Sequence, residues 1–167
     1  MGERVYTSAA LNKKIKALED EKKYLLSLEE KSATYIEVEG DAEIPAYDFT
    51  ETAIKIKDIE NQLIEYKHAL NIFNISTKLP ESYLTIDQAL VKMAMLNRTK
   101  DKLDRMRKRV AKERRIDPYR GSNLVEYTCV NYDIDEVKAE YDAVAEEIIS
   151  LQMGIDFCNQ TMKIELA

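Results

Sequence analysis

The chain has little of what most catalytic sites require. Its 167 residues include one histidine, two cysteines, four glycines and no tryptophan. Four scattered glycines cannot form a glycine-rich phosphate-binding loop. Cys129 and Cys158 follow no metal-ligand spacing and imply no disulfide framework, so we expect a reducing, cytoplasmic location. No apolar run is long enough to span a bilayer, and the first residues lack the apolar core of a secretory signal.

The composition favours long amphipathic helices. Hydrophobic residues make up 45% of the chain and charged residues 34%, with only three prolines. This length fits one domain, residues 1–167, and is enough to bury a sizeable core. The formal net charge is -6. An acidic chain is a poor candidate for binding an anionic membrane or nucleic acid, so we expect neither as a partner.

Four helices are predicted from capping residues followed by apolar residues spaced three and four apart. They begin near Thr7 or Ser8, near Thr50, near Thr85, and near Asp133 or Asp135. Alternating spacings of three and four are typical of helices that pack in a bundle or coiled coil. The four apolar seams are Leu11, Ile15, Leu18, Leu25 and Leu28; Ile56, Ile59, Leu63, Tyr66, Leu70 and Phe73; Ala89, Met93, Leu96, Leu103 and Met106; and Ile134, Val137, Tyr141, Val144, Ile148, Leu151, Ile155, Cys158 and Met162.

Two longer connections contain runs that favour strands. Residues 34–38 and 124–130 are rich in β-branched and aromatic side chains, and each run lies near a glycine and a proline. An isolated two-stranded ribbon is only marginally stable. We therefore expect the two runs to pair with each other and to pack on the helix ends as a small β-ribbon.

The pattern also indicates an internal duplication, approximately residues 7–79 and 85–166. The helix starts and seams of the two halves align, and Lys22 meets Lys100 where each seam is interrupted. Such a lysine either fixes register or oligomeric state, or extends its ammonium group to solvent at the edge of the bundle. The fold class that follows is all-α: an antiparallel four-helix bundle or coiled coil built from two helix–strand–helix repeats.

No constellation of residues indicates catalysis or metal binding. Glu65 and His68 have the Glu-x-x-His spacing of di-metal bundles, but the seam register points His68 away from the core. Cys158 falls on a seam and is expected to be a core residue, and no histidine is near Cys129 in the sequence. We therefore predict no catalytic residue, no metal and no cofactor.

The strongest charge feature is a basic run. Residues 100–115 hold nine Lys or Arg against three acids, whereas residues 133–147 hold seven acids against one lysine. If the third and fourth helices are antiparallel, these stretches lie side by side and largely cancel. The alternative is a phosphate-binding patch. The candidate anion-binding residues are those that the pairing of the two charged stretches covers least: Arg114, Arg115 and Arg120.

Three segments resemble a known family. Residues 69–77, 84–90 and 155–166 together are similar to small bacterial helical proteins that are sometimes labelled septicolysin-like. The resemblance implies a helix, a tip segment and a second helix with an Asn-rich end, repeated along most of the chain. The tips are longer here, and Cys158 and Gln160 depart from the family's pattern. The resemblance implies no catalytic residue.

The sequence therefore predicts a cytoplasmic, non-enzymatic helical protein that acts by self-association, as a homo-oligomer, or by binding another protein. The alternative is a protein that binds nucleic acid or a phosphate ligand through the basic end of the third helix.

Overall fold

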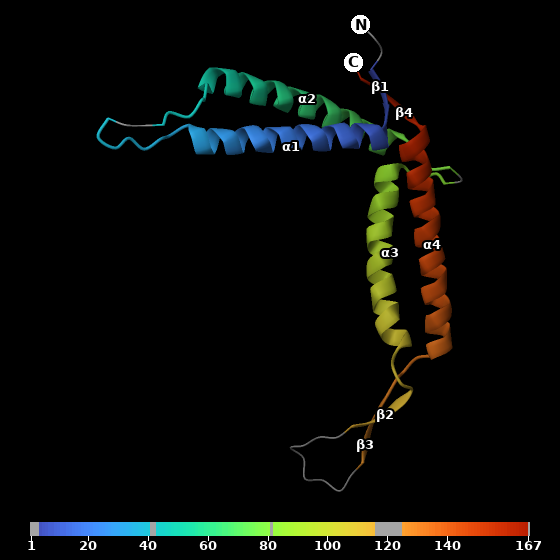
Figure 1. Ribbon diagram of the computed structural model, residues 1–167. Coiled ribbons are helices and arrows are strands. Elements are labelled where there is room, and N and C mark those ends of the chain that lie inside the picture. Colours follow the sequence, from blue (N-terminus) through green and yellow to red (C-terminus); the bar gives the residue numbers. More distant parts are fainter. Residues whose placement is uncertain (1–3, 41–42, 81, 116–124, 167) are drawn as a thin grey trace. The chain divides into compact units, whose positions relative to one another are not determined.

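The computed structural model describes residues 4–40, 43–80, 82–115 and 125–166, and it is mainly helical. The described residues form four helices and four short strands (Figure 1): β1 (Arg4–Thr7), α1 (Ser8–Ser32), α2 (Phe49–Ser76), α3 (Ile86–Arg107), β2 (Lys112–Arg115), β3 (Glu126–Cys129), α4 (Ile134–Thr161) and β4 (Lys163–Leu166). The chain divides into two compact units. Unit 1 is Met1–Thr77 with Asp156–Ala167, and unit 2 is Lys78–Ile155.

Side-chain caps explain where the helices begin. In each case the residue before the helix accepts a hydrogen bond from a backbone N–H of the first turn, which satisfies a donor without a helical partner. At Thr85 the cap is reciprocal, because the side chain of Gln88 in turn accepts from the backbone N–H of Thr85. The predicted helix starts are confirmed. The four capping residues are Thr7, Asp48, Thr85 and Asp133.

The core of unit 1 is the seam between α1 and α2, which run antiparallel. Lys22 and Lys67 bridge the two helices by ion pairs to Glu60 and Glu19. Both pairs are at least partly exposed to solvent, so each adds only roughly 0–1 kcal/mol. Stability therefore comes mainly from the buried apolar side chains. These are Leu11, Ile15, Ile59, Leu63, Tyr66 and Phe73.

Unit 1 also holds a ribbon that the sequence did not predict. β1 and β4 pair antiparallel, with Arg4 opposite Leu166 and Thr7 opposite Lys163. Such a ribbon is marginal alone and needs an apolar surface to pack on. β4 lies against α2 and buries Ile164, so that helix supplies the surface.

Unit 2 is a second antiparallel hairpin, formed by α3 and residues 134–155 of α4 (Figure 1). Its core cluster consists of Leu103, Val137 and Val144. Half-buried apolar side chains surround this cluster, including Leu96 and Tyr141, as the predicted seams require.

The second ribbon corrects the predicted strand pairing. β3 lies within the predicted run 124–130, but it pairs with β2 and not with residues 34–38. Of that earlier run, only Val38 makes an isolated β-bridge. The observed ribbon closes a much shorter stretch of chain, which loses less conformational entropy than a pairing across two helices. The prediction that the two runs pair was therefore wrong.

The four-helix bundle, the internal duplication and the single domain over residues 1–167 stay predictions, because each hairpin is established only within its own unit. Within the described ranges, no helix combines the length and the apolar character that crossing a membrane requires.

Candidate functional site

Two of the three predicted anion-binding residues lie on a strand and not on a helix. α3 ends at Arg107, and the chain re-enters regular structure as β2, where Arg114 and Arg115 are both exposed. Arg120 lies outside the described residues. The structure thus brings Arg114 and Arg115 to one strand of the β2–β3 ribbon.

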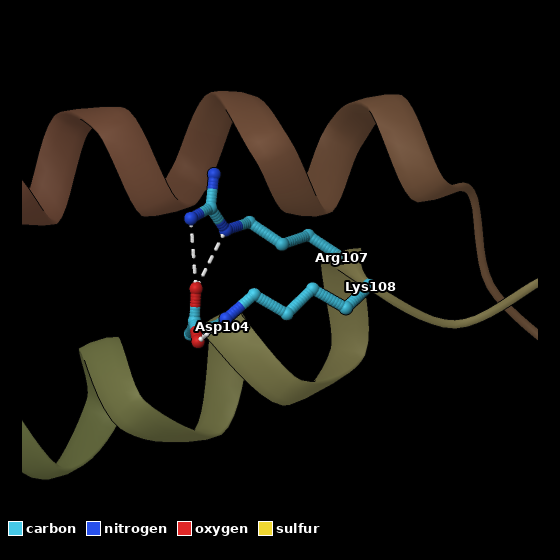
Figure 2. A network of polar contacts seen from close by, with 3 residues as sticks. All are labelled: Asp104, Arg107 and Lys108. Atoms are coloured by element: carbon cyan, nitrogen blue, oxygen red, sulfur yellow. Dashed lines mark hydrogen bonds and ion pairs between the residues drawn. The ribbon is translucent and has the colours of Figure 1, made fainter.

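Two cations at the end of α3 pair with a carboxylate of the same helix. The Asp104 carboxylate accepts hydrogen bonds from the Arg107 guanidinium, at 2.8 and 2.9 Å, and from the Lys108 ammonium group. Figure 2 shows both side chains converging on this carboxylate from one turn further along α3. The hydrogen bonds from Lys108 and Arg107 lower the pKa of Asp104 because they stabilise its charged form.

Besides the apolar core of unit 2, α3 makes an ion pair and ring contacts to the acidic stretch 133–147. Lys92, which precedes the basic run, pairs with Glu147. The Arg107 guanidinium lies 3.8 Å from the centre of the Tyr141 ring. These contacts place residues 133–147 beside α3, whereas β2 lies beside β3. The expected cancellation between the two charged stretches therefore does not extend to Lys112, Arg114 and Arg115.

A groove in unit 1 is a concave feature on which a site can be based, and no pattern in the sequence indicated it. It has a volume of about 600 Å³ and lies between the C-terminal half of α2 and β4. That volume is within the range of small-molecule pockets. We call it the α2–β4 groove. Its lining residues are Glu65, His68, Ala69, Ile72, Phe73, Ser76 and Thr77 of α2 and its C-cap, and Met162, Lys163, Ile164, Glu165 and Leu166.

The groove is apolar with a mixed polar rim. Phe73 and Ile164 are buried in its floor, whereas Ile72 remains 48% exposed. Of the rim carboxylates, Glu65 is paired with Arg4 of β1 at 3.7 Å. The rim thus carries both signs of charge, and the groove favours apolar contact over the binding of a strongly charged ligand.

His68 lies on this rim and is exposed, as the seam register predicted. Over the described part of the chain, no group of three or more His, Cys, Asp or Glu side chains is placed to hold a metal ion.

A second apolar stripe runs along α2 on the side opposite the buried seam. Ile64, His68, Ile72 and Ile75 follow spacings of four, four and three, so they share one helix face. The three isoleucines are 68%, 48% and 61% exposed, respectively. The outer face of a surface helix normally carries charged or polar residues. We call these four residues the outer stripe; two of them also line the α2–β4 groove.

The two cysteines differ sharply in environment. Both are free thiols; Cys129 is exposed on β3, and Cys158 is fully buried in α4. Burial raises the pKa of the Cys158 thiol, since desolvation disfavours the thiolate. The prediction that Cys158 is a core residue is confirmed.

We expect one fast-reacting thiol per native chain. The thiolate is the reactive form, so an aromatic disulfide reagent should titrate Cys129 quickly and Cys158 only on unfolding. Cys129→Ser should remove the fast phase and Cys158→Ser should leave it unchanged. Two fast thiols in the native wild-type chain would contradict the burial of Cys158.

The comparisons with known proteins identify a fold and no family. Neither a protein-family model nor a curated protein matches the chain. A crystal structure of a functionally unknown conserved protein from Corynebacterium diphtheriae is similar, with a TM-score of 0.63 and 17% sequence identity. The match covers 96% of this chain and 99% of that one, so the two proteins share a fold over nearly their whole length.

Proposed function

We propose that this protein acts without catalysis, by self-association or by binding another protein through the outer stripe of α2. The observation that carries the proposal is the row of exposed isoleucines opposite the buried seam. Apolar side chains that gather on one exposed face mark interaction surfaces more often than scattered ones do. The neighbouring α2–β4 groove continues this apolar surface toward β4.

The free energy gained by burying these isoleucines favours a functional state in which the outer stripe is covered. Burying one isoleucine side chain contributes about 1.5–3 kcal/mol. Isoleucines on one helix face form the apolar centre of a groove-bound or paired helix, which is a common mode of recognition between proteins. The sequence resemblance to septicolysin-like helical proteins, the cytoplasmic location and the four-helix bundle are further parts of the proposal. The two free cysteines fit a reducing compartment.

The test is the mass in solution, measured by light scattering over a range of concentrations. We expect an assembly larger than the monomer for the wild type. Replacing Ile64 and Ile72 by Asp should weaken it at least about 100-fold, because two apolar contacts are lost and two charges would be buried.

The matched control is Gln62→Asp, which adds a charge to α2 away from the stripe and should leave the mass unchanged. A strict monomer that turns over a substrate from a broad panel would contradict the proposal. An assembly that Ile64→Asp with Ile72→Asp leaves intact would contradict the role of the stripe.

A second candidate function is the binding of nucleic acid or a phosphate ligand by the basic segment. One observation favours it: the cations of β2 lie on the ribbon with β3, whereas the acidic stretch of α4 lies beside α3.

A further inference from the structure

The β2–β3 ribbon has two chemically different faces. In an antiparallel pair, residues directly opposite each other project to the same face, and successive residues alternate between faces. The register places Lys112 opposite Cys129 and Arg114 opposite Tyr127. These four residues form one side, which we call the basic face.

The other side carries the acids of the ribbon. Glu113 is opposite Thr128, and Arg115 is opposite Glu126. Directly opposed charges of unlike sign attract, so Arg115 faces a carboxylate within its own ribbon. Both acids of the two strands lie on this side, and the basic face has none.

The basic face combines positive charge with an aromatic ring. The Lys112 ammonium group lies 4.2 Å from the centre of the Tyr127 ring, which confirms that the two side chains share a face. Tyr127 is nevertheless 52% exposed. For the residues that the structure describes, no ion pair joins Lys112 or Arg114 to a carboxylate. Two exposed cations beside an accessible ring are the elements with which proteins bind single strands.

We infer that the basic face binds single-stranded nucleic acid, with Lys112 and Arg114 on backbone phosphates and the Tyr127 ring stacked on a base. This rests on the second candidate function and assigns it to one face of one ribbon. A single strand is favoured over a duplex because only an unpaired base exposes its flat surface to a ring.

A single strand is also favoured over an anionic membrane. Interfacial segments embed Trp, Phe or Leu in the lipid. The exposed apolar residues next to the cations in the described part of the ribbon are only Val110, Val125 and the Tyr127 ring. The net charge of -6 further opposes adsorption to an anionic surface, whereas a flexible strand can reach one local patch.

The experiment measures fluorescence anisotropy of labelled 20-nucleotide single-stranded RNA and DNA with the full chain at low salt. Arg114→Gln and Arg115→Gln form the matched pair, since each removes one charge from adjacent positions on opposite faces. We expect Arg114→Gln to weaken binding roughly five- to tenfold and to reduce the salt slope by about 0.7. Arg115→Gln should change affinity less than about twofold.

A second pair tests the ring. Tyr127→Ala should weaken binding about tenfold, because stacking on one base is lost. Thr128→Ala, on the opposite face, should not. Circular dichroism and thermal melting of all four variants report whether the ribbon and helices remain folded. Because the four positions lie at or near the surface of the ribbon, we expect these melts to match the wild type.

The outcomes separate the inference from the candidate function it rests on. Equal losses from Arg114→Gln and Arg115→Gln would show attraction to overall charge, which overturns the assignment to one face and leaves the candidate function standing. No binding by the wild type of either single strand, of a duplex or of inorganic phosphate would overturn both. Preference for a blunt duplex, or for phosphatidylserine vesicles over both strands, would overturn the single-strand assignment.

Discussion

Leu11→Ala should be among the most destabilising single substitutions in unit 1, lowering the free energy of unfolding by about 2–5 kcal/mol. Leu11 is fully buried in the seam between α1 and α2. Removing its side chain loses the transfer free energy of three carbon atoms and leaves a cavity that rigid neighbours fill only in part. Domains are stable by only about 5–15 kcal/mol, so this change is a large fraction of the total. Urea denaturation followed by circular dichroism measures it.

Leu26→Ala is the matched control, because it is the same chemical change on the same helix. Leu26 is 45% exposed, so its truncation should cost less than about 1 kcal/mol. Equal effects of the two substitutions would contradict the assignment of Leu11 to the buried seam. A decrease in the free energy of unfolding below about 1 kcal/mol for Leu11→Ala would also contradict that assignment.

Gly154→Val should destabilise unit 2 by about 1–3 kcal/mol, because the added side chain has no room. A Cβ atom at Gly154 would lie 2.9 Å from Leu79 Cδ2 and 3.6 Å from Leu79 Cβ. Leu79 is itself 97% buried in the turn before α3, being only 3% exposed, so its side chain has little room to move. The stability lost through this steric clash should exceed any stability gained because valine has a higher helix propensity than glycine. Thermal and urea denaturation report the change.

A double-mutant cycle separates this steric clash from other effects. Leu79→Ala alone removes a buried side chain and should cost about 2–5 kcal/mol. In that background the space opposite Gly154 is free, so Gly154→Val should then be neutral or stabilising. The free energy of unfolding of the double variant should be at least about 1 kcal/mol higher than the value expected from adding the two single losses. Simple additivity would show that Leu79 does not restrict position 154.

The helix starts and seams could be predicted because their signals are local. Thr7 and Thr85 each precede an apolar residue pattern, and each is the observed cap. Each predicted seam has apolar residues at helical spacing. Its members Leu11 (α1), Leu63 (α2) and Val144 (α4) are buried as expected. Such patterns depend on residues a few positions apart, so a single sequence contains all the information that specifies them.

The strands could not be predicted as reliably. β2 reads Lys-Glu-Arg-Arg, which are good helix formers, and pairing with β3 overrides that preference. β1 and β4 are four residues each and pair across almost the whole chain, so no turn residue links them in the sequence. For β4, the alternation of Lys163, Ile164, Glu165 and Leu166 was an available sign of a strand.

The same limitation explains the candidate sites. The α2–β4 groove could not be inferred without β4, although His68 was correctly placed away from the core. Arg114 and Arg115 were selected for their distance from the acidic stretch, and the structure leaves both exposed. Which of them lies beside Tyr127 depends on the register of the ribbon, and a single residue of slip exchanges the two faces.

The pairing of β1 with β4 has a consequence for synthesis on the ribosome. Residues 4–7 emerge before the whole of unit 2, and their partners 163–166 emerge after it. At typical elongation rates this delay is on the order of 10 s, far longer than the formation of a helical hairpin. During that interval α1 and α2 can associate while the surface of α2 that packs against β4 is still uncovered. The nascent chain should therefore present this apolar surface to chaperones until β4 emerges.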